Sequence, residues 1–109
     1  MGYKVVVTSD AENDLDQFIQ YLLFKKKNFQ AAQNVLNDFE ATKKSLAQVA
    51  ESLKLCENPR LQMLGYRRIN FLSHRYFMLY RIEEDIVFID NIFQVFINLI
   101  IILIQFLRY

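Results

Sequence analysis

Five arginines gather in a segment without acidic residues, and they are the side chains of this sequence best suited to bind an anion. They lie between positions 58 and 82 and are Arg60, Arg67, Arg68, Arg75 and Arg81. The segment carries a charge of +5, although the whole chain of 109 residues has a formal net charge of +1. Because the planar arginine fork makes two charge-assisted hydrogen bonds to a phosphate, the segment predicts contact with a nucleic acid backbone.

The arginines are expected on two neighbouring strands, which decides which of them can act together. Side chains alternate across a strand, so Arg67 and Arg68 should point to opposite faces, whereas Arg75 and Arg81 should share one. One of the first pair therefore joins Arg75 and Arg81. Tyrosine rings nearby can stack on unpaired bases, and His74 can exchange protons near neutral pH. The candidate RNA-binding residues are Arg68, His74, Arg75 and Tyr80.

A purely structural interpretation of the same residues remains open. The arginines could pair with carboxylates of the next strand, and His74 could be an exposed turn residue. The carboxylates in question are Glu83, Glu84, Asp85 and Asp90. Because strand register is not readable from the sequence, the two interpretations stand side by side.

Composition excludes several other classes of protein. Two glycines allow no glycine-rich phosphate loop, and a single cysteine, Cys56, allows no internal disulfide and no multi-cysteine zinc site. With one histidine there is no histidine cluster, so no metal and no cofactor are expected. A hydrophobic content of 53% excludes a disordered chain. One free thiol and a polar start without a signal peptide indicate a cytoplasmic protein.

The first half of the chain should form a strand and two helices that position this segment. Residues 3–8 are β-branched and aromatic, which predicts a strand, and Ser9 with Glu12 forms a capping box before an apolar period. The helical spacing of apolar residues predicts helices over 10–27 and 30–49. The short connection between them predicts that the two helices form an antiparallel hairpin. The side chains expected to be buried are Leu15, Phe18, Ile19, Leu22, Val35, Leu36 and Phe39.

The second half should form a loop and three strands. Residues 51–65 have no period and contain turn signals, whereas 66–71, 74–82 and 85–92 resemble strands separated by turn-sized gaps. Such strands form an antiparallel meander. The expected fold is therefore α+β, in the order β-α-α-β-β-β, with the helical hairpin packed on an antiparallel sheet.

The last residues form a hydrophobic extension, and the chain is therefore divided into a domain over 1–93 and an extension over 94–109. Thirteen of the residues 93–109 are apolar. Eleven large apolar side chains exceed what one sheet face can shelter, so residues 95–107 are expected to be ordered and buried, most simply against a second copy of the chain. A membrane anchor is the minor alternative, because the run is shorter than a span.

Three stretches together resemble the RelE/ParE superfamily of bacterial toxins. YKVVVTSDAENDLDQFIQYL resembles its first strand and acidic helix start, and ENPRLQMLGYRRINF resembles its loop into an arginine-bearing strand. YFMLYRIEEDIVFIDNIF resembles its strand, Y-R-I turn and strand. The resemblance covers residues 3–93.

The resemblance implies a toxin held inactive by a cognate antitoxin. It implies one of two targets, messenger RNA cut on the ribosome without a metal, or DNA gyrase. For the RNA-cleaving branch it implies catalytic roles for Arg67 and Arg81. Cleavage of messenger RNA on the ribosome is the first expectation, and inhibition of gyrase is the alternative. Relatives often carry a histidine or other basic residue after the last strand, where this chain has Gln94, which weakens the RNA-cleaving interpretation. The altered end raises a third interpretation, an inactive relic.

Overall fold

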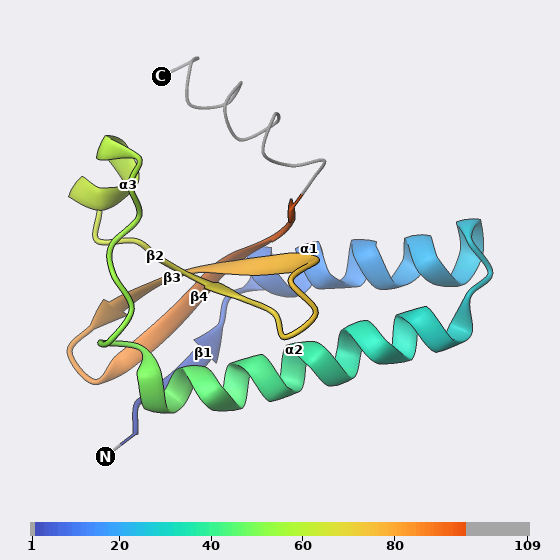
Figure 1. Cartoon of the computed structure of the whole chain (residues 1–109), viewed down its shortest axis with the longest axis horizontal. Coiled ribbons are helices and arrows are strands. Elements are labelled where there is room, and N and C mark those ends of the chain that lie inside the picture. Colours follow the sequence, from blue (N-terminus) through green and yellow to red (C-terminus); the bar gives the residue numbers. More distant parts are fainter. Residues whose placement is uncertain (1, 96–109) are drawn as a thin grey trace.

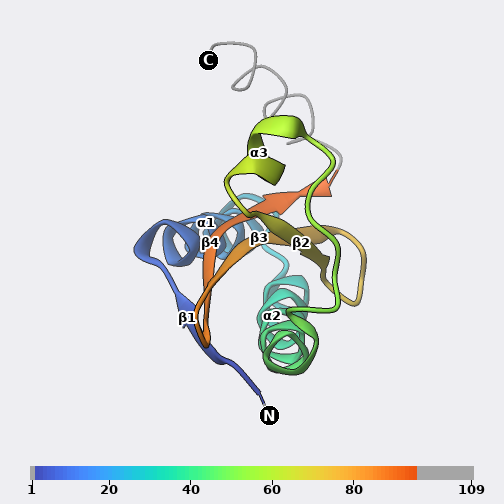
Figure 2. The same cartoon turned by 90° about the vertical axis from the view of Figure 1, so that its left-hand side faces the viewer.

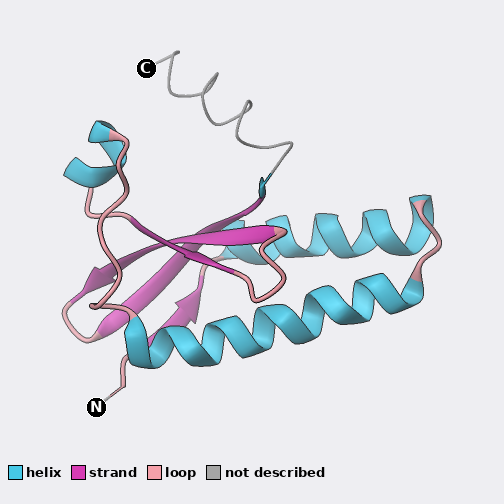
Figure 3. Ribbon diagram, viewed as in Figure 1, coloured by secondary structure: helices cyan, strands magenta, loops and turns pink. Residues whose placement is uncertain are grey.

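The computed structural model of this protein describes residues 2–95 and shows a four-stranded sheet with a long helical hairpin (Figure 1). The two α-helices of the hairpin run antiparallel, as the short connection between them predicts, and Figure 3 shows the two helices side by side. The elements in chain order are β1 (Lys4–Val7), α1 (Ser9–Gln20), η1 (Tyr21–Lys25), α2 (Phe29–Val49), α3 (Pro59–Met63), β2 (Arg67–Asn70), β3 (Tyr76–Glu83) and β4 (Ile86–Gln94). The α+β class and the order of the elements are confirmed.

The first helix begins and ends differently from the prediction. Its cap is Thr8 and not Ser9: the Thr8 hydroxyl accepts a hydrogen bond from the Ala11 amide at 3.3 Å and donates one to the Ile89 carbonyl at 2.9 Å. The second bond explains the shift, because it ties the helix start to strand β4. Beyond Gln20 the α-helix becomes the π-helix η1.

The sheet has the order β1-β4-β3-β2 and is mixed, so the prediction of an antiparallel sheet is wrong for one pair. Strands β2, β3 and β4 form the predicted antiparallel meander, but β1 pairs with β4 in parallel. The hairpin explains this direction. Helix α2 ends beside the start of β1, where the Tyr3 amide donates to the Ala47 carbonyl at 2.8 Å. Strand β2 begins at the same end of the sheet as β1 and runs in the same direction. Strand β3 runs in the opposite direction, and β4 reverses it again, so β4 is parallel to β1.

The core lies between the helical hairpin and one face of the sheet. It contains Phe39 and Leu46 of α2 and Met78, Tyr80 and Ile89 of the sheet, all of them buried. Most of the predicted helix faces agree: Leu15, Phe18 and Val35 pack against this core, and Ile19 and Leu22 are half-buried. The prediction that Leu36 is buried is wrong, because 38% of this residue is exposed. It follows Val35 by about 100° around the helix, which turns it away from the sheet.

The segment predicted as a loop contains one short helix, α3. Asn58 caps it by accepting hydrogen bonds from the Arg60 and Leu61 amides, and Pro59 stands in its first turn. Gly65 follows with a φ of +83°, a conformation that favours glycine. Figure 2 shows α3 and α2 on opposite sides of the strands, so α3 borders the sheet face that α2 does not cover.

The predicted hydrophobic extension lies outside the described residues apart from Gln94 and Val95. Its burial against a second copy therefore stays a prediction. Between residues 2 and 95, no helix has the length and apolar composition that crossing a bilayer requires.

Candidate functional site

The two arginines expected to be catalytic lie on opposite faces of the sheet. Arg67 of β2 stands directly opposite Tyr80 of β3, and residues that face each other across an antiparallel pair point to the same side. Arg81 is the next residue after Tyr80 and therefore points to the other side. A single phosphate cannot contact both side chains in this arrangement.

Arg67 is held by the end of helix α2. Its Nη1 atom donates to the carbonyl oxygens of Ala50 at 3.1 Å and Glu51 at 3.2 Å. Carbonyls at the end of a helix lack partners within the helix and carry a partial negative charge, so a guanidinium is stabilising there. This position gives Arg67 a structural role between the helix and the sheet.

Tyr80 shares that helix end and is fully buried. Its hydroxyl donates to the Ala50 carbonyl at 2.7 Å. Burial raises the pKa of Tyr80 to about 12, because the phenolate would lose its hydration. Since none of the ring is exposed, it presents no face for a base to stack on in this conformation.

Replacing Tyr80 with phenylalanine is expected to lower the free energy of unfolding by about 1 kcal/mol at pH 7, the typical contribution of one hydrogen bond. The raised pKa also predicts a pH effect. The Tyr80 contribution is complete below pH 10, the ordinary tyrosine value, and is lost as the pH rises toward 12. Urea unfolding of both chains at pH 7, 9 and 11 should show that Tyr80→Phe loses about 1 kcal/mol less between pH 9 and 11. Equal losses in the two chains would contradict this.

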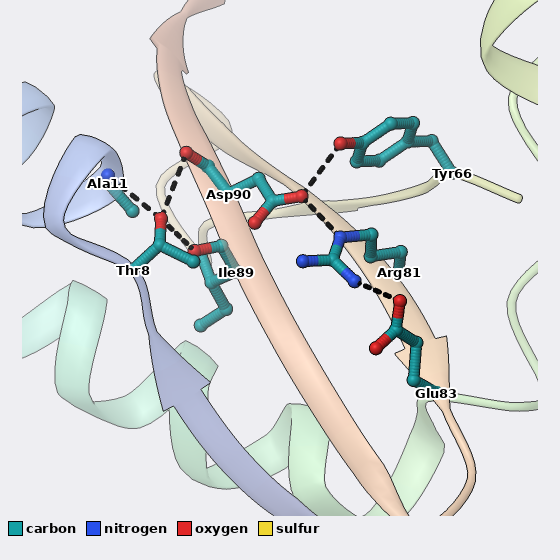
Figure 4. Close-up of polar contacts among 7 residues, drawn as sticks. All are labelled: Thr8, Ala11, Tyr66, Arg81, Glu83, Ile89 and Asp90. Atoms are coloured by element: carbon teal, nitrogen blue, oxygen red, sulfur yellow. Dashed lines mark hydrogen bonds and ion pairs between the residues drawn. The ribbon is translucent and has the colours of Figure 1, made fainter. Parts of the chain in front are cut away.

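Arg81 lies on the other sheet face and is paired with two acids (Figure 4). Its Nε donates to Asp90 Oδ2 at 2.7 Å and its Nη1 to Glu83 Oε1 at 2.6 Å. The guanidinium carbon lies 4.5 Å from the centre of the Phe88 ring. The hydrogen bond with Asp90 raises the pKa of Arg81 further above its ordinary value. The pairing with carboxylates that the sequence left open is therefore observed for Arg81.

Tyr66 completes what we call the Arg81 network, which consists of Tyr66, Arg81, Glu83 and Asp90. The Tyr66 hydroxyl donates to the same Asp90 oxygen at 2.7 Å. Burial, and then the hydrogen bond with Asp90, raise the pKa of Tyr66, so it is a neutral donor and not a base at pH 7. With one cation and two carboxylates, the network has a formal charge of −1, which gives little attraction for a phosphate.

A strand irregularity places Asp90 in this network. The register between β3 and β4 shifts after Leu79, which pairs with Asn91, because Tyr80 pairs with Ile89. Asp90 is the extra residue of the resulting bulge, and its carbonyl accepts a 3.3 Å hydrogen bond from the Thr8 hydroxyl. Bulges re-aim side chains in this way. The sequence names Asp90 as a possible partner, but it carries no signal for the bulge.

The remaining predicted residues are spread along the sheet. Arg68 stands opposite Leu79, and its guanidinium lies 3.8 Å from the centre of the Phe77 ring. It therefore shares the face of Arg81, which confirms that one of the Arg67 and Arg68 pair joins it. Arg75 is exposed just before β3.

His74 is exposed in the turn between β2 and β3, with a φ of +61°. Strand β3 separates this turn from Arg81, and the five residue-to-residue steps from Tyr76 to Arg81 span about 17 Å. His74 and Arg81 therefore do not meet at one reacting group. Between residues 2 and 95, no three side chains of His, Cys, Asp or Glu gather as a metal ion would require.

Comparisons with known proteins agree with this fold. The family model described as "ParE toxin of type II toxin-antitoxin system, parDE" matches residues 5–94. A structure of the chromosomal ParDE toxin–antitoxin system from P. aeruginosa superimposes with a TM-score of 0.67 and 22% identity, covering 85% of this chain and 96% of that one. The toxin–antitoxin complex RelBE2 from Mycobacterium tuberculosis gives 0.60 and 18%, covering 86% and 99%. No curated protein matches the sequence.

Proposed function

The chain belongs to the ParE toxin family of type II toxin–antitoxin systems, and we propose that it stops bacterial growth by binding DNA gyrase. The family membership supports a toxin that a cognate antitoxin holds inactive, and the two similar structures described above are of toxin–antitoxin systems. Gyrase is a more specific target than the family membership supports, and the proposal that it is the target depends on the geometry of the arginines.

The proposal of gyrase rests on one observation. Arg67 and Arg81 lie on opposite faces of the sheet, and the side chains of both already make hydrogen bonds within the chain. Cleavage of RNA without a metal requires several charged groups to converge on one phosphate, where they stabilise the developing charge. Here Arg67 binds a helix end, Arg81 binds two carboxylates, and His74 is a strand length away. A toxin that acts by binding a protein needs none of these groups to converge.

Ribosome-dependent cleavage of messenger RNA, the other target implied by the resemblance, stays a prediction. It would depend on the exposed residues Arg68, His74 and Arg75, because Arg67 and Arg81 are less exposed and are held by internal partners. An inactive relic stays the third possibility.

Induction of the chain in a bacterium distinguishes the three. We expect growth arrest with loss of negative supercoiling in a reporter plasmid, unchanged 5′ ends of messenger RNA, and rescue by the antitoxin. New 5′ ends within translated codons, with normal supercoiling, would overturn the gyrase proposal. No arrest, despite a folded chain, would indicate the relic.

A further inference from the structure

Three large aromatic side chains are exposed together where the helical hairpin turns. They are Tyr21, Phe24 and Phe29, with 51%, 70% and 74% of each residue exposed. Phe and Tyr at such exposures leave water in contact with large apolar surface, and a cluster of them marks an interaction site more often than a single exposed residue does. None of the three belongs to the stripe that α1 buries.

The same region carries only positive charge. No acidic residue occurs between Asp16 and Asp38, and Lys25, Lys26 and Lys27 give this stretch a charge of +3. Lys26 Nζ lies 5.9 Å from the centre of the Tyr21 ring. The charges of Lys25 and Lys27 have no carboxylate partner among residues 2–95.

The backbone holds this region in one arrangement. In η1 the Lys26 amide donates to the Tyr21 carbonyl at 3.1 Å, the wide spacing of a π-helix. The Asn28 amide donates to the Leu22 carbonyl at 2.8 Å, and the Asn28 side chain accepts from Ala31 at 2.9 Å. Single π-turns are frequent at functional sites, and a preorganised surface loses less entropy on binding.

The shape favours a protein over a nucleic acid as the partner. Figures 1 and 3 show the hairpin extending past the sheet, so that the turn is a protruding end of the molecule. Proteins bind single-stranded nucleic acids in grooves that follow the backbone. A protruding group of aromatic rings instead fits a pocket in another protein, where such rings contribute most of the binding energy. A second copy of this chain is disfavoured, because two all-positive surfaces would face each other.

We propose that the hairpin tip, defined as Tyr21, Phe24, Lys25, Lys27 and Phe29, docks into an apolar pocket rimmed by carboxylates on the toxin's protein target. The inference rests on the proposed function, because it takes the target to be a protein. The aromatic rings supply the buried contact, and the two lysines supply the orientation and the rate of association. In this proposal the Arg81 network stabilises the fold and does not contact the target.

Two tip variants and one control variant test this. Phe24→Ser with Phe29→Ser removes the rings, and Lys25→Glu with Lys27→Glu reverses the charge. The control is Met63→Ser with Leu72→Ser, which removes apolar residues that are 81% and 70% exposed elsewhere. Circular dichroism and urea unfolding establish that all three keep the fold. Binding to purified gyrase and to a single-stranded RNA is then measured at two salt concentrations, and growth arrest is measured in cells.

We expect the ring variant to bind gyrase at least about 30-fold more weakly, the magnitude of one lost hot spot, and to lose growth arrest. The charge variant should lose affinity mostly at low salt, and the control should stay within about threefold of the wild type. Gyrase binding that the ring variant retains, with full arrest, would overturn the docking surface and leave the proposed function standing. A wild type that ignores gyrase, with arrest still lost in the ring variant, would overturn the gyrase target alone. RNA binding lost only in the tip variants would overturn a protein partner.

Discussion

Replacing Phe71 with alanine is expected to lower the free energy of unfolding by about 3–5 kcal/mol. Phe71 is fully buried directly after β2, and it joins helix α2 to the sheet. Its ring centre lies 6.3 Å from that of Phe39 and 5.5 Å from that of Tyr76. Removing the ring opens a cavity among side chains that cannot collapse into it without moving the helix.

The adjacent residue provides the matched control. Leu72 is 70% exposed, so Leu72→Ala should change the free energy of unfolding by less than about 0.5 kcal/mol. Urea unfolding followed by circular dichroism compares the two variants with the wild type. A loss below about 1 kcal/mol for Phe71→Ala would contradict the aromatic contact between the hairpin and the sheet.

Replacing Asp90 with alanine is expected to lower the free energy of unfolding by about 2–3 kcal/mol. One oxygen of Asp90 accepts from both Arg81 and Tyr66, and the Arg81 and Asp90 side chains are only 28% and 16% exposed. The substitution leaves a partly buried guanidinium with one weaker partner and a phenol with none, and unpaired groups of this kind are costly.

Glu83→Ala serves as the control, because Glu83 is 63% exposed and an exposed ion pair contributes at most about 1 kcal/mol. The double variant Asp90→Ala with Arg81→Met should lose less than the sum of the two single variants, since each removes the other's partner. Equal effects of Asp90→Ala and Glu83→Ala, or a strictly additive double variant, would contradict the Arg81 network.

The parts of the fold that local patterns determine could be predicted from the sequence. The apolar period of Leu15, Phe18 and Ile19 predicts a helix because the same face repeats each turn, and the β-branched run of β1 predicts a strand. The parallel pairing of β1 with β4 could not be predicted, because it depends on where α2 ends, more than 40 residues from β1. Helix α3 had a signal, an asparagine cap followed by proline, which also fits a turn.

The candidate site, like the fold, could be predicted only in part. Alternation along a strand correctly predicted that one of Arg67 and Arg68 shares the face of Arg81, but without the register it could not tell which one. The partners of Arg67 are backbone carbonyls, which no pattern of side chains reveals. The hairpin tip carries a signal in the sequence, because Tyr21, Phe24 and Phe29 are large apolar residues that do not fit the predicted buried stripe.

Titration of the purified chain into purified gyrase acting on relaxed plasmid distinguishes a gyrase target from an RNA target. We expect supercoiling to stop as the chain is added and to resume when the cognate antitoxin is added. We also expect the same preparation to leave messenger RNA intact in a ribosome-containing translation reaction. Full supercoiling at every concentration, together with cleavage of the messenger RNA on the ribosome, would contradict the gyrase proposal.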